Sequence, residues 1–363
     1  MRDGAVPDEL DLALVATLQA APRADWQRVG HVLGVAGSTA ARRWGRLTES
    51  GLAWLTCHPM RLPGIVPVIA LIDVNCQPAR LPAVAATLAE DPHVISLIAP
   101  SSRCDLHVTA GFTDLASLSR YVAFRLAAVD GITATRAQIA TVHTDASRWS
   151  VDRLNARQQA ALGARRPAGE PGAARPGSDG PQDADLALMT ALSQDCRLPA
   201  VDLAERTDLS PSTVHRRLAR LETSRTLVYR CELAPPVCGW PVGMNFWATL
   251  PPGQSALIIA QLCRMREVRA CLSLSGASQL NFVVRLRSVE DIPRFQARLA
   301  RELPALVITD QAFSLWTIKL AGHLLDFEGR HVRHVPIGRW PEEEAARAEA
   351  TAVGRLRHGP AAL

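Results

Sequence analysis

The stretch LSPSTVHRRLARLE, residues 209–222, combines a strong helix start with a basic face. Ser210 suits the N-cap position, and Pro211 suits the first helical turn, where its missing N–H costs nothing. Val214, Leu218 and Leu221 recur at the spacing of one helical face, which predicts a buried side. The other faces then display the polar side chains of Ser212, Thr213, His215, Arg216, Arg217 and Arg220.

The same pattern occurs earlier in the chain, as VAGSTAARRWGRLT at residues 35–48. A constant shift of 174 residues superimposes the two stretches and also pairs Asp11 with Asp185 and Cys57 with Cys231. Gly37 stands where the later copy has proline, so Ser38 is an alternative N-cap, and Trp44 takes the inward position of a leucine. The exposed polar set of this copy is Ser38, Thr39, Arg42, Arg43 and Arg46.

The setting of the basic helix indicates its use. In each half two short amphipathic segments, a tight turn, the basic helix and an alternating strand follow one another, and we read the end of this unit as a hairpin. That order predicts a winged helix-turn-helix, whose third helix fits the major groove of DNA. The alternative is that the arginines only solvate an exposed helical face, but their repetition in both copies favours DNA.

A second module follows each basic helix. Residues 64–146 and 240–321 both predict strand, helix, strand, strand, helix, strand, which is the order of a ferredoxin-like unit. Helices cover one face of such a sheet and leave the other face to be buried by a partner. We therefore expect the two halves to pair with each other within one chain, and we also expect homo-oligomers.

The predicted fold class is α+β, with two winged helix-turn-helix domains that are each followed by a ferredoxin-like βαββαβ domain. Between the halves lies a segment rich in Ala, Arg, Gly and Pro without apolar periodicity, which predicts a flexible linker. The predicted domains are residues 8–60 and 183–234 for the winged helices, 64–146 and 240–322 for the ferredoxin-like units, 155–182 for the linker, and 323–363 for a charged tail ending in a short helix.

The combination resembles the Lrp/AsnC (leucine-responsive regulator) family of prokaryotic transcription factors. The resemblance covers residues 8–150 and 182–322, and DLAERTDLSPSTVHRRLARLE, residues 202–222, is similar to the family's helix-turn-helix signature. It implies pairing through the ferredoxin-like domain and sensing of an amino acid or related small effector there. The family's Gly-x-x-Asp turn is incomplete in both halves, because one keeps the acid and the other the glycine. The implied effector residues are Ser102 and Asp105 in the first turn, and Gly276 and Gln279 in the second.

We interpret the chain as a cytoplasmic transcriptional regulator without catalytic activity, which binds double-stranded DNA at two unequal half-sites. Siroheme decarboxylases resemble it as well, and His107, Arg136 and His143 are the candidates for such an activity. The second half has Asn281, Asp310 and Thr317 at the corresponding positions. A third interpretation is a small-molecule sensor that has lost DNA recognition, and the two turns could also be ordinary hairpin turns.

Other functional classes find little support in the composition. The eight cysteines form no Cys-x-x-Cys pair and no zinc-ligand spacing with histidine, so we expect reduced core residues, no metal and no cofactor. No apolar run is long enough for a spanning helix or resembles a secretory signal, so no membrane partner is expected. The net charge of +5 is a weak indication of an anionic partner.

Overall fold

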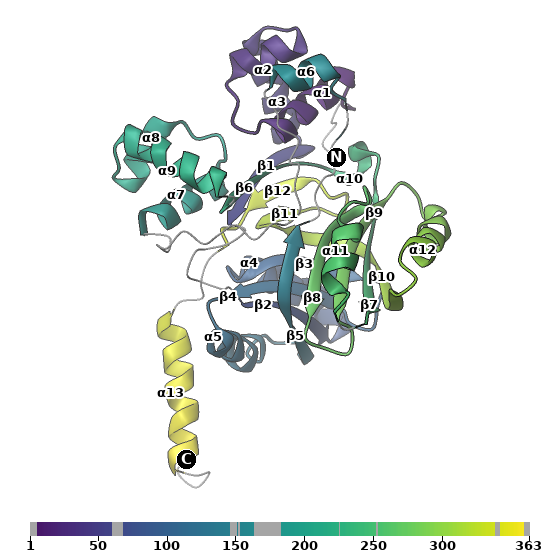
Figure 1. Cartoon of the computed structure of the whole chain (residues 1–363). Coiled ribbons are helices and arrows are strands. Elements are labelled where there is room, and N and C mark those ends of the chain that lie inside the picture. Colours follow the sequence, from purple (N-terminus) through teal and green to yellow (C-terminus); the bar gives the residue numbers. More distant parts are fainter. Residues whose placement is uncertain are drawn as a thin grey trace.

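The computed structural model describes residues 6–59, 68–145, 151, 153–162, 183–224, 226–251, 253–337 and 342–358. Each half begins with a three-helix unit and one strand. These elements are α1 (Glu9–Ala20), α2 (Trp26–Leu33), α3 (Gly37–Glu49) and β1 (Ala53–Pro59), and in the second half α7 (Asp183–Gln194), α8 (Ala200–Thr207), α9 (Pro211–Thr223) and β6 (Leu227–Leu233). Figure 1 shows both three-helix units on the same side of the large sheet.

The strand after each basic helix pairs with its counterpart in the other half. β1 and β6 form a two-stranded antiparallel sheet in which Leu55 lies opposite Cys231. The hairpin read from the sequence is therefore wrong for the described residues: each half supplies one strand, and the ladder runs between the halves. Periodicity cannot show this, because a strand has the same alternation whichever partner it finds.

The two ferredoxin-like units have the predicted order, which confirms the α+β fold class. The first comprises β2 (Val68–Cys76), η1 (Pro78–Arg80), α4 (Leu81–Glu90), β3 (Val94–Pro100), β4 (Leu106–Phe112), α5 (Leu115–Arg120), the π-helical η2 (Tyr121–Leu126) and β5 (Ile132–Asp145). After the short α10 (Pro235–Cys238), the second comprises β7 (Val242–Thr249), α11 (Ser255–Leu262), β8 (Val268–Leu274), β9 (Leu280–Leu286), α12 (Asp291–Glu302) and β10 (Val307–Leu320).

The strands of both units form one sheet that returns on itself. Its order is β10-β3-β4-β2-β5-β8-β9-β7, and β10 also pairs with β7, which closes the ring. β10 does this because it is long: its first part pairs with β7 and its last part with β3. Alternate residues of β2 consequently face different surroundings. Ala70, Ile72 and Val74 pack into the helix-covered core, whereas Leu71 packs with Leu272 and Leu274 inside the ring.

The segment after β10 extends the sheet. β11 (His323–Leu325) and β12 (His331–His334) add two short strands to its edge, in a region that the sequence presents as a charged tail. The backbone N–H of His331 donates to the carbonyl of Gly51, which fixes this edge to the end of α3. The last helix, α13 (Glu342–His358), lies apart from the three-helix units (Figure 1), and its Glu349 binds Arg120 at 2.6 Å.

Helix α6 (Ala156–Ala161) lies inside the segment that the sequence presents as a linker. It packs on α2, where Gln158 donates to the carbonyl of Val32 and Arg28 donates to the carbonyl of Leu162. Residues 163–182 of the segment lie outside the described residues. Among the helices described, none has the length and apolar character that crossing a bilayer requires.

Candidate functional site

Helix α9 carries the basic face singled out from the sequence. It begins at Pro211, with the Ser210 side chain accepting a hydrogen bond from the N–H of Thr213. Val214, Leu218 and Leu221 are buried against the rest of the unit. This orientation exposes Ser212, His215, Arg216 and Arg220, and leaves Thr213 and Arg217 partly exposed.

Two arginines of α9 bind a carboxylate that the sequence analysis left without a role. Asp185 of α7 is fully buried, and its carboxylate pairs with Arg217 at 2.9 Å and with Arg220. A buried carboxylate must be paired, and two guanidinium groups satisfy it here. The available signal was the repeated Asp-Leu-Ala-Leu motif, which places an aspartate at the same point of both first helices. Arg217 therefore holds the unit together, whereas Arg216 points outward.

The first half repeats this arrangement. Buried Asp11 pairs with Arg43 at 2.9 Å and with Arg46 at 2.5 Å. Arg43 also binds Asp8 at 2.8 Å, and this hydrogen bond holds the pKa of the Asp8 carboxyl below its ordinary value. Arg42, the counterpart of Arg216, is exposed together with Ser38, while Thr39 is partly exposed.

Helix α3 starts differently from α9. It begins at Gly37, its N-cap residue is Ala36, and no side chain caps it, so the alternative of Ser38 as N-cap is wrong. A Cβ atom on Gly37 would lie 2.8 Å from the carbonyl oxygen of Trp26. The helix-turn-helix angle in this copy therefore depends on a glycine at the position of Pro211.

The two three-helix units are joined by hydrogen bonds from equivalent arginines. Arg23 donates to the carbonyls of Cys196 and Leu198, at 2.5 and 2.9 Å. Arg197, which the 174-residue shift pairs with Arg23, donates to the carbonyls of Pro22 and Ala24, each at 2.6 Å. Together with the β1–β6 ladder, these bonds hold α3 and α9 in a fixed pair.

The two turns expected to bind an effector lie where the halves meet. Ser101 donates its N–H to the carbonyl of Phe313, and Ser275 in the second half donates to the carbonyl of Ile139. Ser102 and Gln279 are exposed, and Gly276 approaches Gln138 of the other half closely. Asp105 is already engaged, since its carboxylate accepts the N–H of Cys76 at 2.8 Å.

A cluster of chemically active side chains lies beside the first turn, on the inner face of the ring. The Nδ1 of buried His107 lies 2.8 Å from the Oδ1 of Asp73, and the Cys104 thiol donates to the same oxygen at 3.7 Å. Burial opposes ionisation of Asp73, but the interactions with His107, Cys104 and Arg136 together outweigh it, and the pKa of this carboxyl lies below its ordinary value. Burial raises the pKa of the Cys104 thiol to about 11. Trp247 of the second half meets His107 edge-on.

The other two residues considered for catalysis, Arg136 and His143, both lie on β5. Arg136 lies opposite Asp73 in the sheet and is exposed, and its charge contributes to the low pKa of that carboxyl. The side chain of His143 lies outside the described residues. At the positions in the second half that correspond to His107, Arg136 and His143, Asn281 is buried, Asp310 is exposed and Thr317 is partly exposed.

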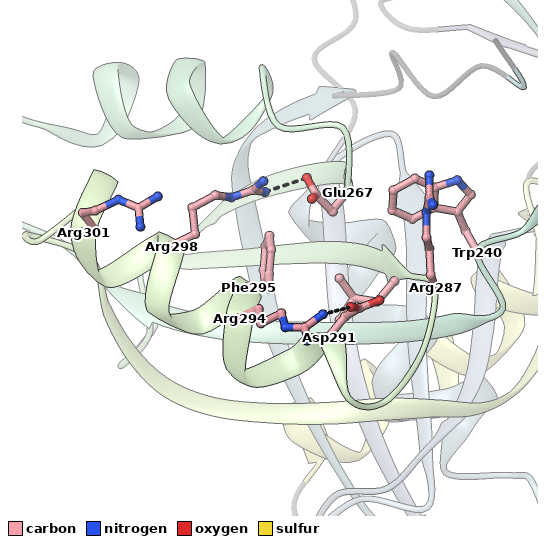
Figure 2. Close-up of a pocket in the computed structure, with 9 residues that line it drawn as sticks. Trp240, Glu267, Arg287, Asp291, Arg294, Phe295, Arg298 and Arg301 are labelled. Carbon is pink, nitrogen blue, oxygen red and sulfur yellow. Dashed lines mark hydrogen bonds and ion pairs between the residues drawn. The ribbon is translucent and has the colours of Figure 1, made fainter.

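An arginine-lined pocket of about 450 Å³, which the sequence analysis missed, lies beside α12 (Figure 2). Arg294, Arg298 and Arg301 come from this helix, and Arg287 stacks over the ring of Trp240 at 5.1 Å. Two carboxylates offset part of the charge: Glu267 binds Arg298 at 2.6 Å, and Asp291 lies 3.7 Å from Arg294. The signal in the sequence was the spacing of the three arginines along one helical face.

Comparison with known proteins identifies the domain type of the three-helix units and the family of the chain. Residues 8–48 and 183–222 each match the AsnC-type helix-turn-helix domain. The HTH-type transcriptional regulator LrpA of Mycobacterium tuberculosis is 34% identical over 116 residues, which cover 30% of this chain and 77% of LrpA. The chain belongs to the Lrp/AsnC family. An HTH-type transcriptional regulator of Pyrococcus horikoshii is 27% identical over 150 residues, covering 40% of this Lrp/AsnC chain and 92% of that protein.

The tandem architecture of this family member also occurs in an enzyme. A crystal structure of the siroheme decarboxylase NirDL, in complex with an iron-uroporphyrin III analogue, covers 96% of this chain and 100% of that chain, with a TM-score of 0.56 and 15% identity. The expectation that the chain has no catalytic activity is contradicted by this likeness, because nearly the whole molecule has an enzyme's fold. At this identity the likeness concerns the fold alone.

Proposed function

We propose that the protein is a sequence-specific transcriptional regulator that reads two related DNA half-sites with α3 and α9. The observation that carries this proposal is the repeated exposed basic face on the third helix of each unit. The hydrogen bonds of Arg23 and Arg197 between the two units support this proposal, because a fixed pair of recognition helices favours a fixed spacing of the two DNA half-sites. Such a regulator would act on DNA in the prokaryotic cytoplasm.

In this proposal some exposed residues of the two helices contact bases, and others contact phosphates and position the protein on DNA. Arg42 and Arg216 are the arginines of each copy that the described ion pairs leave available for guanine edges or phosphates. Arg46 and Arg220 are about half exposed beyond their aspartate pairs, so they are further phosphate contacts in this proposal. His215 stands where the first copy has Ala41, so the preferred operator would be an imperfect palindrome.

The test is binding of the full chain to fragments of its own upstream DNA over a range of salt concentrations. Replacing Arg42 and Arg216 together by alanine should weaken specific binding at least tenfold, and should lower the salt dependence by about 0.9 for each phosphate that is no longer neutralised. Arg264→Ala is the matched control, because Arg264 is exposed on a ferredoxin-like unit away from α3 and α9. Unchanged binding by the double variant would exclude this role for the helices.

The same measurement with an amino-acid mixture tests the proposed effector. Ser102, Asp105, Gly276 and Gln279 line turns that contact the opposite half, so a ligand there would change how the halves pack. A shift in DNA affinity that Ser102→Ala or Gln279→Ala removes would support this part. Effector binding without any DNA binding would favour a sensor that has lost DNA recognition.

A second candidate function is decarboxylation of a polycarboxylated tetrapyrrole. It is favoured by the whole-chain fold likeness and by two chemical features. An imidazole held by a carboxylate, as in His107 and Asp73, suits proton transfer, and the arginine-lined pocket suits carboxylates. The purified protein would be incubated with siroheme, and products would be followed by absorption and by the mass lost as carbon dioxide. The variant His107→Asn tests the imidazole and carboxylate pair, and Arg298→Ala tests the arginine-lined pocket. If the unaltered protein binds no siroheme, this function is excluded.

A further inference from the structure

Three potential metal ligands of different chemistry meet on the inner face of the first ferredoxin-like unit. The Asp73 carboxylate comes from β2, the His107 imidazole from β4, and the Cys104 thiol from the turn before β4. One ligand atom from each lies within 4.8 Å of the other two. The Asp73 side chain is 40% exposed and that of His107 only 5%, so the cluster is anchored in the ring and open on one side.

The separations are close to those around a tetrahedral cation. With zinc bonds of about 2.0 Å to nitrogen or oxygen and about 2.3 Å to sulfur, adjacent ligand atoms lie roughly 3.3 Å apart for nitrogen and oxygen, and roughly 3.6 Å for sulfur and oxygen. The observed distances are 2.8 Å from Nδ1 to Oδ1 and 3.7 Å from Sγ to Oδ1. Small side-chain rotations are therefore enough to place a cation among the three atoms.

Hydrogen bonds hold the three side chains together, and a bound cation would take the place of the shared hydrogens. The Cys104 thiol and the Nδ1–H of His107 both point at Asp73 Oδ1. Metal binding releases the thiol proton, and the neutral imidazole coordinates through Nδ1 once its proton has moved to Nε2. A mixed set of carboxylate, imidazole and thiolate suits zinc and similar transition metals, whereas magnesium and calcium need oxygen ligands.

The cluster occurs in one half only. The 174-residue shift places Trp247, Ser278 and Asn281 at the positions of Asp73, Cys104 and His107. None of these three side chains is a strong zinc ligand. Trp247 instead meets the edge of His107 across the ring, with 5.5 Å between ring centres. The duplication has thus produced one asymmetric cluster per chain.

We infer that Asp73, Cys104 and His107 bind one divalent transition-metal ion of the zinc class per chain. Three protein ligands leave a fourth coordination position for water or a small ligand. The ion ties β2, β4 and the turn at residues 101–105, and this turn bonds β10 of the second half through Ser101 and Phe313. Metal binding therefore stiffens the contact between the halves, and this inference does not depend on DNA binding.

The test uses cobalt(II) as a spectroscopic probe on the metal-free full chain. The expected result is one cobalt per chain, a thiolate charge-transfer band, loss of that band on adding zinc, and a higher melting temperature with zinc. Cys104→Ser should abolish the band. Asp73→Asn and His107→Gln should weaken binding at least about tenfold.

Cys238→Ser is the matched control, because this partly buried thiol bonds only its own loop among the described residues and lies outside the cluster. Its cobalt spectrum should equal that of the unaltered chain. Circular dichroism of every variant verifies the fold, so that a missing band reports a missing ligand. Absence of the thiolate band in the folded unaltered chain, or a band that persists in folded Cys104→Ser, overturns the inference.

Discussion

At the scale of single residues, neighbouring arginines on the basic helices have different tasks. Arg216 is exposed, whereas Arg217 is mostly buried and bound to Asp185. The sequence placed both on the outer side, because helical spacing separates them from Val214 and Leu218 but says nothing about a partner 32 residues earlier. The aspartate was visible as a repeat, yet its burial follows only from packing between α7 and α9.

The two ion pairs of Asp185 predict a loss of stability when its charge is removed. Asp185→Ala removes the buried partner of Arg217 and Arg220, which both keep some contact with solvent, so the second three-helix unit should lose about 1–3 kcal/mol of stability. Denaturant unfolding, with hydrogen exchange to locate the change in α7–α9, measures this loss. Glu205→Ala removes an exposed carboxylate of α8 and serves as the control. Equal stability of the two variants would show that the ion pairs contribute nothing.

At the scale of elements, sequence patterns predicted the helices and long strands but missed details set by close packing. The ferredoxin-like order follows from alternation and amphipathicity, as in the buried Ala70, Ile72 and Val74 of β2. β11 and β12 are too short for periodicity to register, and their pairing depends on the end of β10. The cluster of Asp73, Cys104 and His107 could not be predicted from the sequence, because its members lie on separate elements that only the folded sheet brings together.

Two glycines of α3 give a matched test of close packing. A Cβ atom at Gly37 would meet backbone atoms of Trp26, which cannot yield without moving α2, whereas a Cβ atom at Gly45 meets nothing within 4 Å. Gly37→Ala should therefore cost about 1–3 kcal/mol. Gly45→Ala should add about 0.5–1 kcal/mol, because alanine favours the helix. Thermal unfolding compares the two, and a stabilised Gly37→Ala would contradict the close approach of α2 to Gly37.

The edge formed by β11 and β12 predicts sensitivity to acid. Burial, reinforced by His334 and His331, lowers the pKa of His323 to about 2, and neither ring nitrogen of His323 has a hydrogen-bond partner among the described residues. Burial also lowers the pKa of His334 to about 4. The unfolded chain binds protons first, at its ordinary pKa of about 6.5, so stability should fall as the pH drops below that value.

Melting curves between neutral and mildly acidic pH, about 7.5 to 5, measure this dependence. His323→Phe should flatten the curve, because the ring is kept and the titratable group is removed. His31→Phe is a control at an exposed histidine on α2. An unchanged slope in His323→Phe would show that His323 does not set the acid sensitivity.

At the scale of the molecule, the two halves build one structure. β5 pairs with β8, β10 pairs with β3, and both ladders join strands from different halves. The duplication in the sequence predicted that the halves pair, since each ferredoxin-like sheet leaves one face uncovered. It did not predict that β10 closes the ring, because this depends on one long strand dividing its length between two neighbours.

Closure of the ring predicts that the halves stay together after the chain is cut. A protease site inserted within residues 163–182 should yield two fragments that elute as one species and unfold in one transition, because breaking either cross-ladder also exposes the apolar contact of Leu71, Leu272 and Leu274. Replacing Leu272 and Leu274 by aspartate buries two charges there and should separate the cut fragments. Separate elution of the cut but otherwise unaltered chain would mean that the linker, and not the ring, holds the halves together.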